Sequence, residues 1–303
     1  MNGNPGNTSP IRVFVAGAGV MGSGIAQVSA EAGFSTTLFD ADSANLDRGL
    51  HSIQARWRRT LESGKRDEAF VSGATSHLYT GTLDDAGSAD IIIEAIFEQL
   101  AAKSALLREL GARAKPEALL ASNTSSISIT ALGRASGSPR RFIGMHFFNP
   151  VPVLPLVEVV KGLESDPAIV QAGVSFIERL SKIPVVVEDA PGFVANRVLL
   201  PMINEAIFTL QENVAPRENI DQIMKLGMAH PMGPLALADL IGLDVCLDIL
   251  ETLQRDFGDD KYRPAPLLRR MVAAGQLGRK TGQGFYDYPP QNESPGRFAE
   301  RAQ

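Results

Sequence analysis

The glycine-rich segment near the start of the chain, GAGVMG, constrains the fold more than any other stretch. It follows IRVFVA, residues 11–16, a short β-branched run with the pattern of a buried strand. Gly17, Gly19 and Gly22 have G-x-G-x-x-G spacing and open a helix-like segment, and a second strand pattern, STTLFD, ends at Asp40. The order strand, glycine turn, helix, strand predicts a βαβ unit.

This context makes the glycine turn the fingerprint of a dinucleotide-binding site. Gly17 permits the tight turn, Gly19 leaves room for a pyrophosphate, and Gly22 lets helix and strand approach closely. The phosphates would then meet the free N–H groups and the positive end of the helix. We therefore expect the turn, including Val20 and Met21, to bind the cofactor.

The carboxylate of Asp40 should lie beside this turn, because it closes the second strand pattern. An acid at this place accepts hydrogen bonds from the adenine-ribose hydroxyls and repels a 2′-phosphate, which favours NAD over NADP. FAD is the rival cofactor, but the sequence shows no second nucleotide segment of the kind that flavoproteins often carry. The alternative to a dinucleotide-binding site is a purely structural glycine-rich turn beside a strand-end aspartate.

Strand and helix patterns alternate as far as residue 188, which predicts a mostly parallel sheet covered by helices, with an antiparallel portion at its end. After that the strand patterns stop, and helical patterns follow between Pro/Gly turns such as HPMGP. The predicted fold class is α/β, a Rossmann-like doubly wound sheet followed by an all-helical C-terminal domain. The expected segments are a disordered tail (1–10), an NAD-binding Rossmann domain (11–189) with one long polar helical pattern at 42–70, a helical substrate and dimerisation domain (190–288), and a loose tail (289–303).

Composition excludes several classes of function. The 303 residues carry a net charge of −5 without a long basic run, which makes nucleic acid an unlikely partner. The single cysteine, Cys246, excludes an internal disulfide and a thiolate metal site, and we expect it to be a buried apolar residue and the protein to hold no metal. The first ten residues lack the pattern of a secretory signal, and no apolar run is long enough to span a membrane, which favours a cytoplasmic protein.

The segment GMHFFNPVPVLPLVEVV places two ionisable residues in otherwise apolar strand patterns. If the strands fold back around Pro152, His146 and Glu158 face each other. The pair is either a buried structural network or a general base with the carboxylate that orients it. The other three histidines lie in polar or boundary segments, at His51, His77 and His230.

Several segments together resemble the 3-hydroxyacyl-CoA dehydrogenases, and most closely the short-chain bacterial 3-hydroxybutyryl-CoA dehydrogenases. The resemblance covers residues 11–288 and implies reversible oxidation of a short-chain (S)-3-hydroxyacyl-CoA to the 3-ketoacyl-CoA with NAD, as in the β-oxidation of fatty acids. It also implies a homodimer formed by the helical domain. The segments are GAGVMGSGIAQ, EAIFEQLAAK, SNTSSISIT, GMHFFNPVPVLPLVEVV, PGFVANR, GMAHPMGPLALADLIGLD and GRKTGQGFYDY.

The resemblance also implies roles for individual residues. His146 would be the general base and Glu158 its partner, while Ser125 and Asn196 would bind the reacting substrate oxygens. The structural alternative for Ser125 is a helix cap, and that for Asn196 is a capping or turn residue. The residues expected to touch the cofactor, besides the glycine turn and Ser125, are Asp40, Glu98, Lys103, Asn149 and Lys280; the alternative for Glu98 and Lys103 is a solvated helix pair.

Two departures from the family pattern concern the substrate. Arg56 stands where the CoA-contacting helix of the family often has a serine, and Ser63 where it often has a lysine. We expect CoA contacts from a basic set that comprises Arg56, Arg58, Arg59 and Lys65, against the alternative of a solvated basic face.

The second departure is the extra proline in LPLVEV, which is similar to dehydrogenases of free hydroxy acids or carnitine. An enzyme of that kind is therefore the first alternative. A non-catalytic protein that retains an NAD site is the second.

Overall fold

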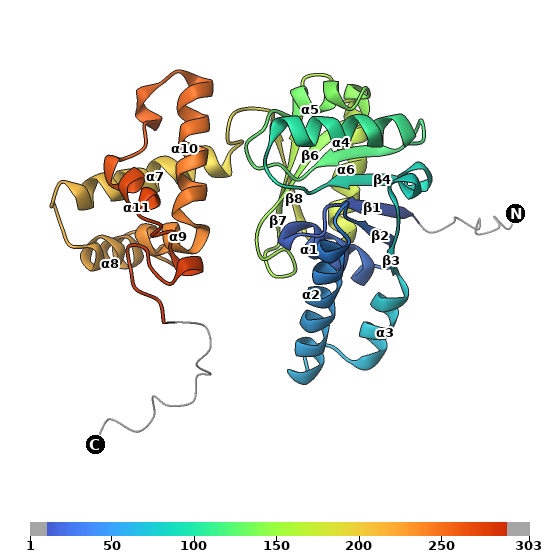
Figure 1. Cartoon of the computed structure of the whole chain (residues 1–303), viewed down its shortest axis with the longest axis horizontal. Coiled ribbons are helices and arrows are strands. Elements are labelled where there is room, and N and C mark those ends of the chain that lie inside the picture. The colour runs from blue at the N-terminus through green and yellow to red at the C-terminus, as the bar shows by residue number, and fades with distance from the viewer. Residues whose placement is uncertain (1–10, 290–303) are drawn as a thin grey trace, which may run out of the picture. The chain divides into compact units, whose positions relative to one another are not determined.

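A computed structural model of the chain describes residues 11–289 (Figure 1). These residues divide into two units, the first ending at Phe193 and the second beginning at Val194. The expected boundary at residue 190 lies beside this division. The expected tails at 1–10 and 289–303 lie outside the described residues, apart from Pro289.

The first unit contains one eight-stranded sheet with the order β3-β2-β1-β4-β5-β6-β7-β8. All neighbouring strands are parallel except β6 and β7, which form an antiparallel pair. The predicted fold class is thereby confirmed, including the antiparallel portion. The strands are β1 (Arg12–Ala16), β2 (Ser35–Phe39), β3 (Leu78–Thr80), β4 (Ile91–Glu94), β5 (Leu119–Ser122), β6 (Phe142–Phe147), β7 (Leu156–Lys161) and β8 (Ile183–Glu188).

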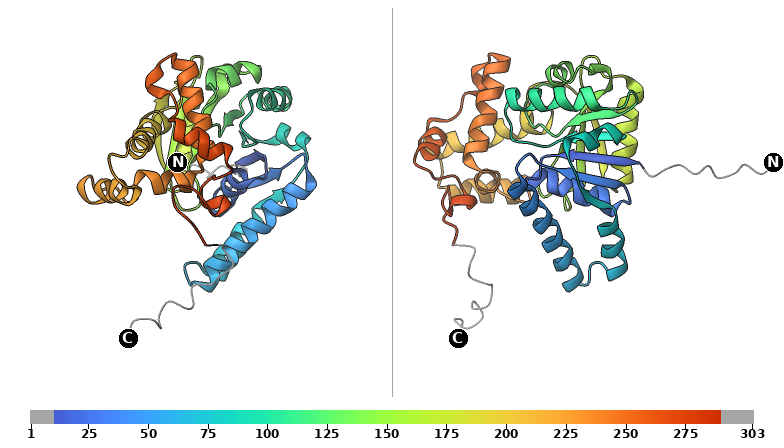
Figure 2. Two further views of the ribbon diagram at one scale, coloured as in Figure 1. Left: turned by 60° about the vertical axis from the view of Figure 1, so that its left-hand side comes forward. Right: turned by 45° about the vertical axis from the view of Figure 1, so that its right-hand side comes forward.

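Helices cover both faces of this sheet, because the strands are apolar on both faces (Figures 1 and 2). Alternate residues of β1 show this: Val13 and Val15 belong to the core under one set of helices, and Phe14 belongs to the core under the other. The helices on the first face are α1 (Val20–Glu31), α2 (Ser43–Glu62) and α6 (Pro167–Arg179), and those on the second are α4 (Leu100–Arg113) and α5 (Ile129–Ala135).

The polar helical pattern at 42–70 forms two helices, α2 and α3 (Glu68–Ser76), that project away from the sheet (Figure 1). The break follows Ser63, where Gly64 adopts a left-handed φ of 67° that an α-helix does not continue. Asp67 then caps α3 by accepting a hydrogen bond from the N–H of Phe70.

The second unit is helical, as predicted. Its core contains Leu200, Leu235 and Leu250 together with Cys246, which is fully buried as expected, and burial raises the pKa of this thiol to about 12. The segment LALADLIGLDVCLDILETLQRDF forms two helices, because Gly242 takes a φ of 107° between them. The helices are α7 (Ala195–Gln211), α8 (Arg217–Gly227), α9 (Pro234–Ile241), α10 (Leu243–Phe257) and α11 (Pro266–Ala273).

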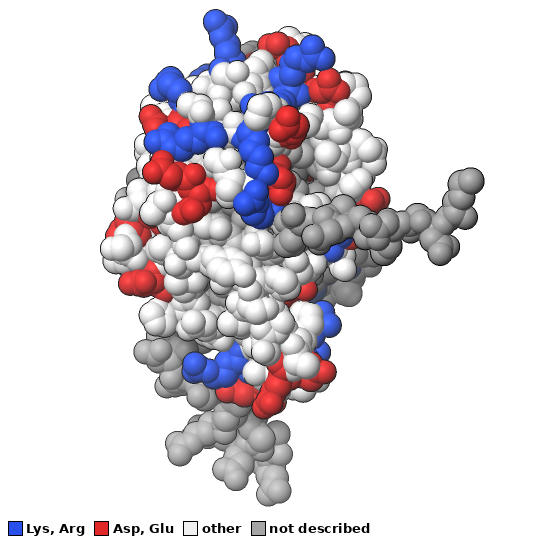
Figure 3. Space-filling view, turned by 90° about the vertical axis from the view of Figure 1, so that its right-hand side faces the viewer, with Lys and Arg blue, Asp and Glu red and all other residues white. Residues whose placement is uncertain are grey.

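Charged side chains of both signs lie intermixed on the face that Figure 3 shows. None of the helices in residues 11–289 has the combination of length and apolar character that crossing a membrane requires.

Candidate active site

The glycine turn joins β1 to α1 in the conformation that a dinucleotide needs. Gly17 has a φ of 110°, and a Cβ at this position would lie 2.5 Å from the carbonyl oxygen of Ala95. A Cβ at Gly22 would collide with the carbonyl oxygen of Gly17, so this glycine permits the close contact between helix and turn. A Cβ at Gly19 would meet no atom within 4 Å, which leaves its face of the turn open to a ligand.

The start of α1 is suited to an anion. Gly19 is its N-cap and offers no side-chain hydrogen bond to the first-turn N–H groups. Val20, in the first turn, is 69% exposed, and Met21 beside it is partly buried. The uncapped N–H groups and the positive end of the helix fit the pyrophosphate of NAD.

Asp40 lies directly beside this turn. Its carboxylate accepts a hydrogen bond of 2.8 Å from the N–H of Ala18 and another from the side chain of Asn45. The strand-end acid is therefore tied to the turn, at the place where the adenine ribose of a dinucleotide lies.

His146 and Glu158 are direct partners in the antiparallel register of β6 and β7. The Nδ1 atom of His146 lies 2.7 Å from Oε2 of Glu158, and both residues are buried. The His146 ring also packs on Phe148 and Phe193, with centroid distances of 4.6 and 5.8 Å. The predicted facing of the two residues around Pro152 is thus observed.

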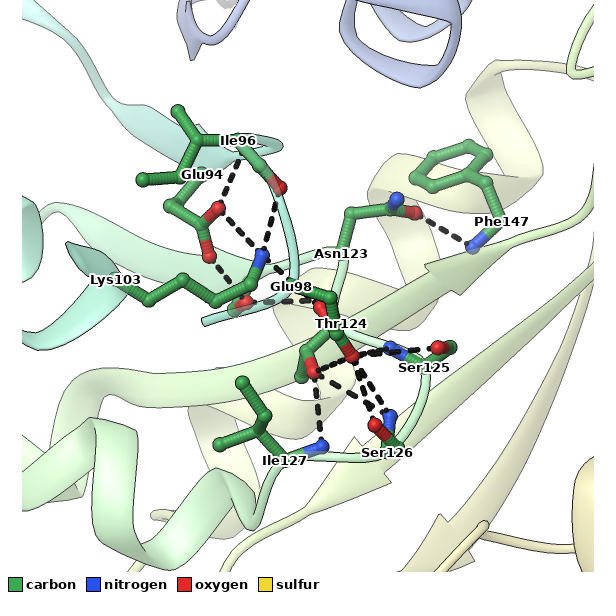
Figure 4. A network of polar contacts seen from close by, with 11 residues as sticks. Glu94, Ile96, Glu98, Lys103, Asn123, Thr124, Ser125, Ser126, Ile127 and Phe147 are labelled. Atoms are coloured by element: carbon green, nitrogen blue, oxygen red, sulfur yellow. Dashed lines mark hydrogen bonds and ion pairs between the residues drawn. The ribbon is translucent and has the colours of Figure 1, made fainter. Parts of the chain in front are cut away.

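Glu98 organises the residues that follow β5, here called the serine turn (residues 123–126). Its Oε1 accepts hydrogen bonds from the hydroxyls of Thr124, Ser125 and Ser126, and from the N–H groups of Ser125 and Ser126 (Figure 4). The serine turn also reaches β6, because Oδ1 of Asn123 accepts the N–H of Phe147 at 3.0 Å. Glu98 and Ser125 therefore lie together, and the serine turn is bonded to the residue next to His146.

Lys103 approaches Glu98 from the opposite side. Its ammonium is 2.7 Å from Oε1 of Glu94, 3.0 Å from the carbonyl oxygen of Ile96 and 3.3 Å from Oε2 of Glu98. The Lys103 side chain is only 1% exposed in this arrangement, and its contact with the cofactor stays a prediction. The alternative of a solvated helix pair does not describe these residues, because Lys103 is buried and Glu98 precedes α4.

The pKa of Glu98 lies below its ordinary value. Partial burial acts to raise it, but the Lys103 ammonium and the donors of the serine turn outweigh this effect. Glu98 is accordingly held as a carboxylate.

Sequence reasoning missed Glu94. It is the last residue of β4, is fully buried, and pairs in register with Ser122 of β5. The segment IIIEAI did contain the signal, since a carboxylate in a buried apolar strand needs a partner.

The remaining predicted residues are distributed as follows. Asn149 is exposed and lies two residues after the end of β6. Asn196 lies in the first turn of α7, as predicted, and Lys280 lies in the short 3-10 turn Arg279–Thr281, where its ammonium contacts the carboxylate of Asp244 at 2.5 Å. Asn196 and Lys280 both belong to the second unit.

The basic set on α2 divides into two groups. Arg58 and Arg59 are exposed, as is Lys65 just after the helix. Arg56 instead points toward α1, where its guanidinium donates to Gln27 and Ser52, and burial lowers its pKa. The structure therefore does not place Arg56 with the three exposed cations.

Comparisons with known proteins agree with this geometry. Residues 12–190 match the family model of the NAD-binding domain of 3-hydroxyacyl-CoA dehydrogenase, and residues 192–288 match the model of its C-terminal domain. The chain is 51% identical to a probable 3-hydroxybutyryl-CoA dehydrogenase of Bacillus subtilis, over 91% of this chain and 97% of that protein. It is 49% identical to the 3-hydroxybutyryl-CoA dehydrogenase of Bradyrhizobium diazoefficiens, over 91% and 95%.

A solved structure is similar over the same extent. The crystal structure of (S)-3-hydroxybutyryl-CoA dehydrogenase from Ralstonia eutropha superposes with a TM-score of 0.90 at 45% identity, covering 93% of this chain and all of that one. Both family models and the full-length relatives thus agree with the nucleotide turn and the sheet described above. The chain therefore belongs to the 3-hydroxyacyl-CoA dehydrogenase family of NAD-dependent oxidoreductases.

Proposed function

We propose that this enzyme interconverts a short-chain (S)-3-hydroxyacyl-CoA, such as 3-hydroxybutyryl-CoA, and the corresponding 3-ketoacyl-CoA. The observation that carries the proposal is the buried His146–Glu158 pair at 2.7 Å, on the sheet that also holds the nucleotide turn. The names of the relatives at about half identity support the short-chain CoA substrate.

His146 is the proposed general base. In the proposed tautomer the Nδ1–H group donates to the Glu158 carboxylate, and Nε2 accepts the hydroxyl proton of the substrate. Glu158 then stabilises the imidazolium that forms. In the reverse direction the same imidazolium returns the proton to the ketone oxygen.

Ser125 and Asn196 are the proposed groups that bind the substrate oxygens, and Asp40, Glu98, Asn149 and Lys280 the proposed cofactor contacts. NAD, when bound, supplies the hydride acceptor at the nicotinamide ring. The serine turn supports the role of Ser125, because its backbone is fixed by Glu98 and Asn123.

The CoA moiety is proposed to contact the exposed cations Arg58, Arg59 and Lys65. Guanidinium and ammonium groups pair well with the phosphates of CoA. Arg56 is left out of this set because Gln27 and Ser52 already occupy its guanidinium.

The test is NADH oxidation with acetoacetyl-CoA, with free acetoacetate and 3-dehydrocarnitine as the rival substrates. We expect fast turnover on the CoA ester only. A combined Arg58→Gln and Arg59→Gln variant should raise KM for the ester while kcat is kept, and Arg108→Gln, which removes an exposed arginine from α4, should not. Turnover on a free acid and none on the ester would identify a CoA-independent dehydrogenase. NADH binding with no turnover on any ketone would identify a non-catalytic protein.

The homodimer expected from the family resemblance stays a prediction. A dimeric mass in sedimentation at micromolar concentration would support it, and a monomeric mass would contradict it.

A further inference from the structure

Glu94 has an unusual position for a carboxylate. It is fully buried at the end of β4, and its two oxygens serve different segments. Oε1 accepts the N–H of Ile96 and the ammonium of Lys103, both at 2.7 Å. Oε2 accepts the hydroxyl of Ser122, at the end of β5, at 2.5 Å. A buried ion pair contributes little net stability to a fold. Stability alone therefore does not explain why a carboxylate occupies this position.

Two routes lead from Glu94 to the serine turn, and Figure 4 shows the first, through Lys103 and Glu98. In the first, Glu94 and Glu98 lie on either side of the Lys103 ammonium, and Glu98 in turn accepts the donors of Thr124, Ser125 and Ser126. In the second, the Ser122 hydroxyl that donates to Glu94 also accepts the N–H of Thr124 at 3.1 Å. The Glu94 carboxylate thus restrains the serine turn both through Lys103 and Glu98 and through Ser122.

We infer that Glu94 is a positioning residue for the reaction: through Lys103 and Ser122 it holds Glu98 and the serine turn, and with them the Ser125 hydroxyl, in the geometry that substrate and cofactor require. The inference rests on the proposed function. The charge arrangement supports it, because one cation serves two carboxylates and is anchored on the fully buried one. Glu98 is then held by the same ammonium while its other oxygen faces the serine turn.

The first experiment does not depend on turnover. Hydrogen–deuterium exchange is measured in residues 122–127 for the wild type, Glu94→Gln and Ser122→Ala. Both variants should exchange faster in this segment, with the larger increase in Glu94→Gln, because that change weakens both routes. The matched control is Asp90→Asn, which alters a carboxylate at the amino end of β4 that pairs with Lys115 and accepts the N–H of Arg12. Unchanged exchange in residues 122–127 of Glu94→Gln would overturn the inference.

The second experiment measures the consequence for catalysis. Because small displacements of catalytic groups lower turnover by up to roughly 10²-fold, Glu94→Gln should lower kcat on acetoacetyl-CoA by about tenfold or more. Its NADH dissociation constant should also rise, because Glu98 is a proposed cofactor contact, whereas Asp90→Asn should keep the wild-type kcat and NADH affinity. Equal kcat values for Glu94→Gln and Asp90→Asn would contradict the inference.

The pH profile separates positioning from general destabilisation. The charged groups around Lys103 in the described residues are Glu94 and Glu98, and the serine turn adds uncharged donors. Lys103→Met removes the cation that helps to lower the pKa of Glu98, so its activity should fall at a higher pH than that of the wild type as the solution is acidified. The double variant Glu94→Gln with Lys103→Met also weakens the route through Ser122 and should have a lower kcat than Lys103→Met alone. A double variant as active as Lys103→Met would contradict the inference. An inactive wild type would refute the proposed function instead, and the exchange experiment would still decide the role of Glu94.

Discussion

Glu98 in the first unit and Asp239 in the second are both carboxylates that hold a segment distant in the sequence, but their surroundings differ. Glu98 gathers the serine turn and faces the ammonium of Lys103, and its side chain is 36% exposed. Asp239, on α9, is 1% exposed and accepts the N–H groups of Phe285 and Tyr286 and the hydroxyl of Tyr288.

The two pKa values accordingly shift in opposite directions. Partial burial opposes ionisation of Glu98, but Lys103 and the serine turn lower its pKa overall. Burial raises the pKa of Asp239, the hydrogen bonds to it oppose the rise without cancelling it, and Asp221 adds to it. The ammonium of Lys103 thus helps to keep Glu98 charged, whereas Asp239, whose pKa is raised, holds α9 to the segment after Arg279–Thr281.

The largest effect on kcat should come from changing the His146–Glu158 pair of the first unit. His146→Gln should lower kcat by about 10³-fold, since general acid–base catalysis contributes roughly 10²–10⁴-fold, and should leave NADH binding intact. Steady-state kinetics and NADH fluorescence titration measure the two quantities. His77→Gln, at the end of α3, is the control and should keep full activity. A His146→Gln variant with near-wild-type turnover would show that the base is another residue.

Asp239→Asn should change stability instead of catalysis. An amide nitrogen in place of a carboxylate oxygen meets the N–H of Tyr286 donor to donor, which should cost about 2 kcal/mol of unfolding free energy. Denaturant unfolding checks this, with kcat expected within about twofold of wild type for the folded enzyme. The exposed Asp260→Asn should cost less than about 0.5 kcal/mol. If Asp239→Asn lowered kcat as strongly as His146→Gln, the carboxylate of Asp239 would not have a purely structural role.

The smallest effect is the pH dependence of stability, and its sign differs between the two carboxylates. Because the pKa of folded Glu98 is below its ordinary 4.5, Glu98 adds stability that is present above that value and is lost as the pH falls through the folded pKa. The pKa of folded Asp239 is above its ordinary 3.8, so its contribution is greatest below that value and declines as the pH rises toward the folded pKa.

Unfolding free energies measured against pH for wild type, Glu98→Gln and Asp239→Asn test these signs. The stability difference between wild type and Glu98→Gln should shrink on acidification, and that for Asp239→Asn should shrink as the pH rises above 3.8. If both stability differences shrank on acidification, or both shrank as the pH rose, the interactions assigned to Glu98 and Asp239 would be wrong.

Local patterns were enough for much of the molecule. The glycine turn, the mostly parallel sheet with its antiparallel end, and the helical second unit could be predicted, because each depends on spacing along a short segment. The facing of His146 and Glu158 could also be predicted, since a reversal at Pro152 determines which residues of two adjacent strands pair. The break at Gly64 was missed because a polar helical pattern continues across it.

What the sequence by itself determined is the family, the nucleotide turn with Asp40, and the identity of the histidine beside its glutamate. Only the tertiary structure decided that Lys103 is buried between Glu94 and Glu98, that Arg56 points toward α1 while Arg58 and Arg59 remain exposed, and that Glu94 serves the serine turn. The physical reason is that hydrogen bonds and ion pairs between the ends of neighbouring parallel strands join residues far apart in the chain. No periodicity within one segment encodes which of those side chains meet.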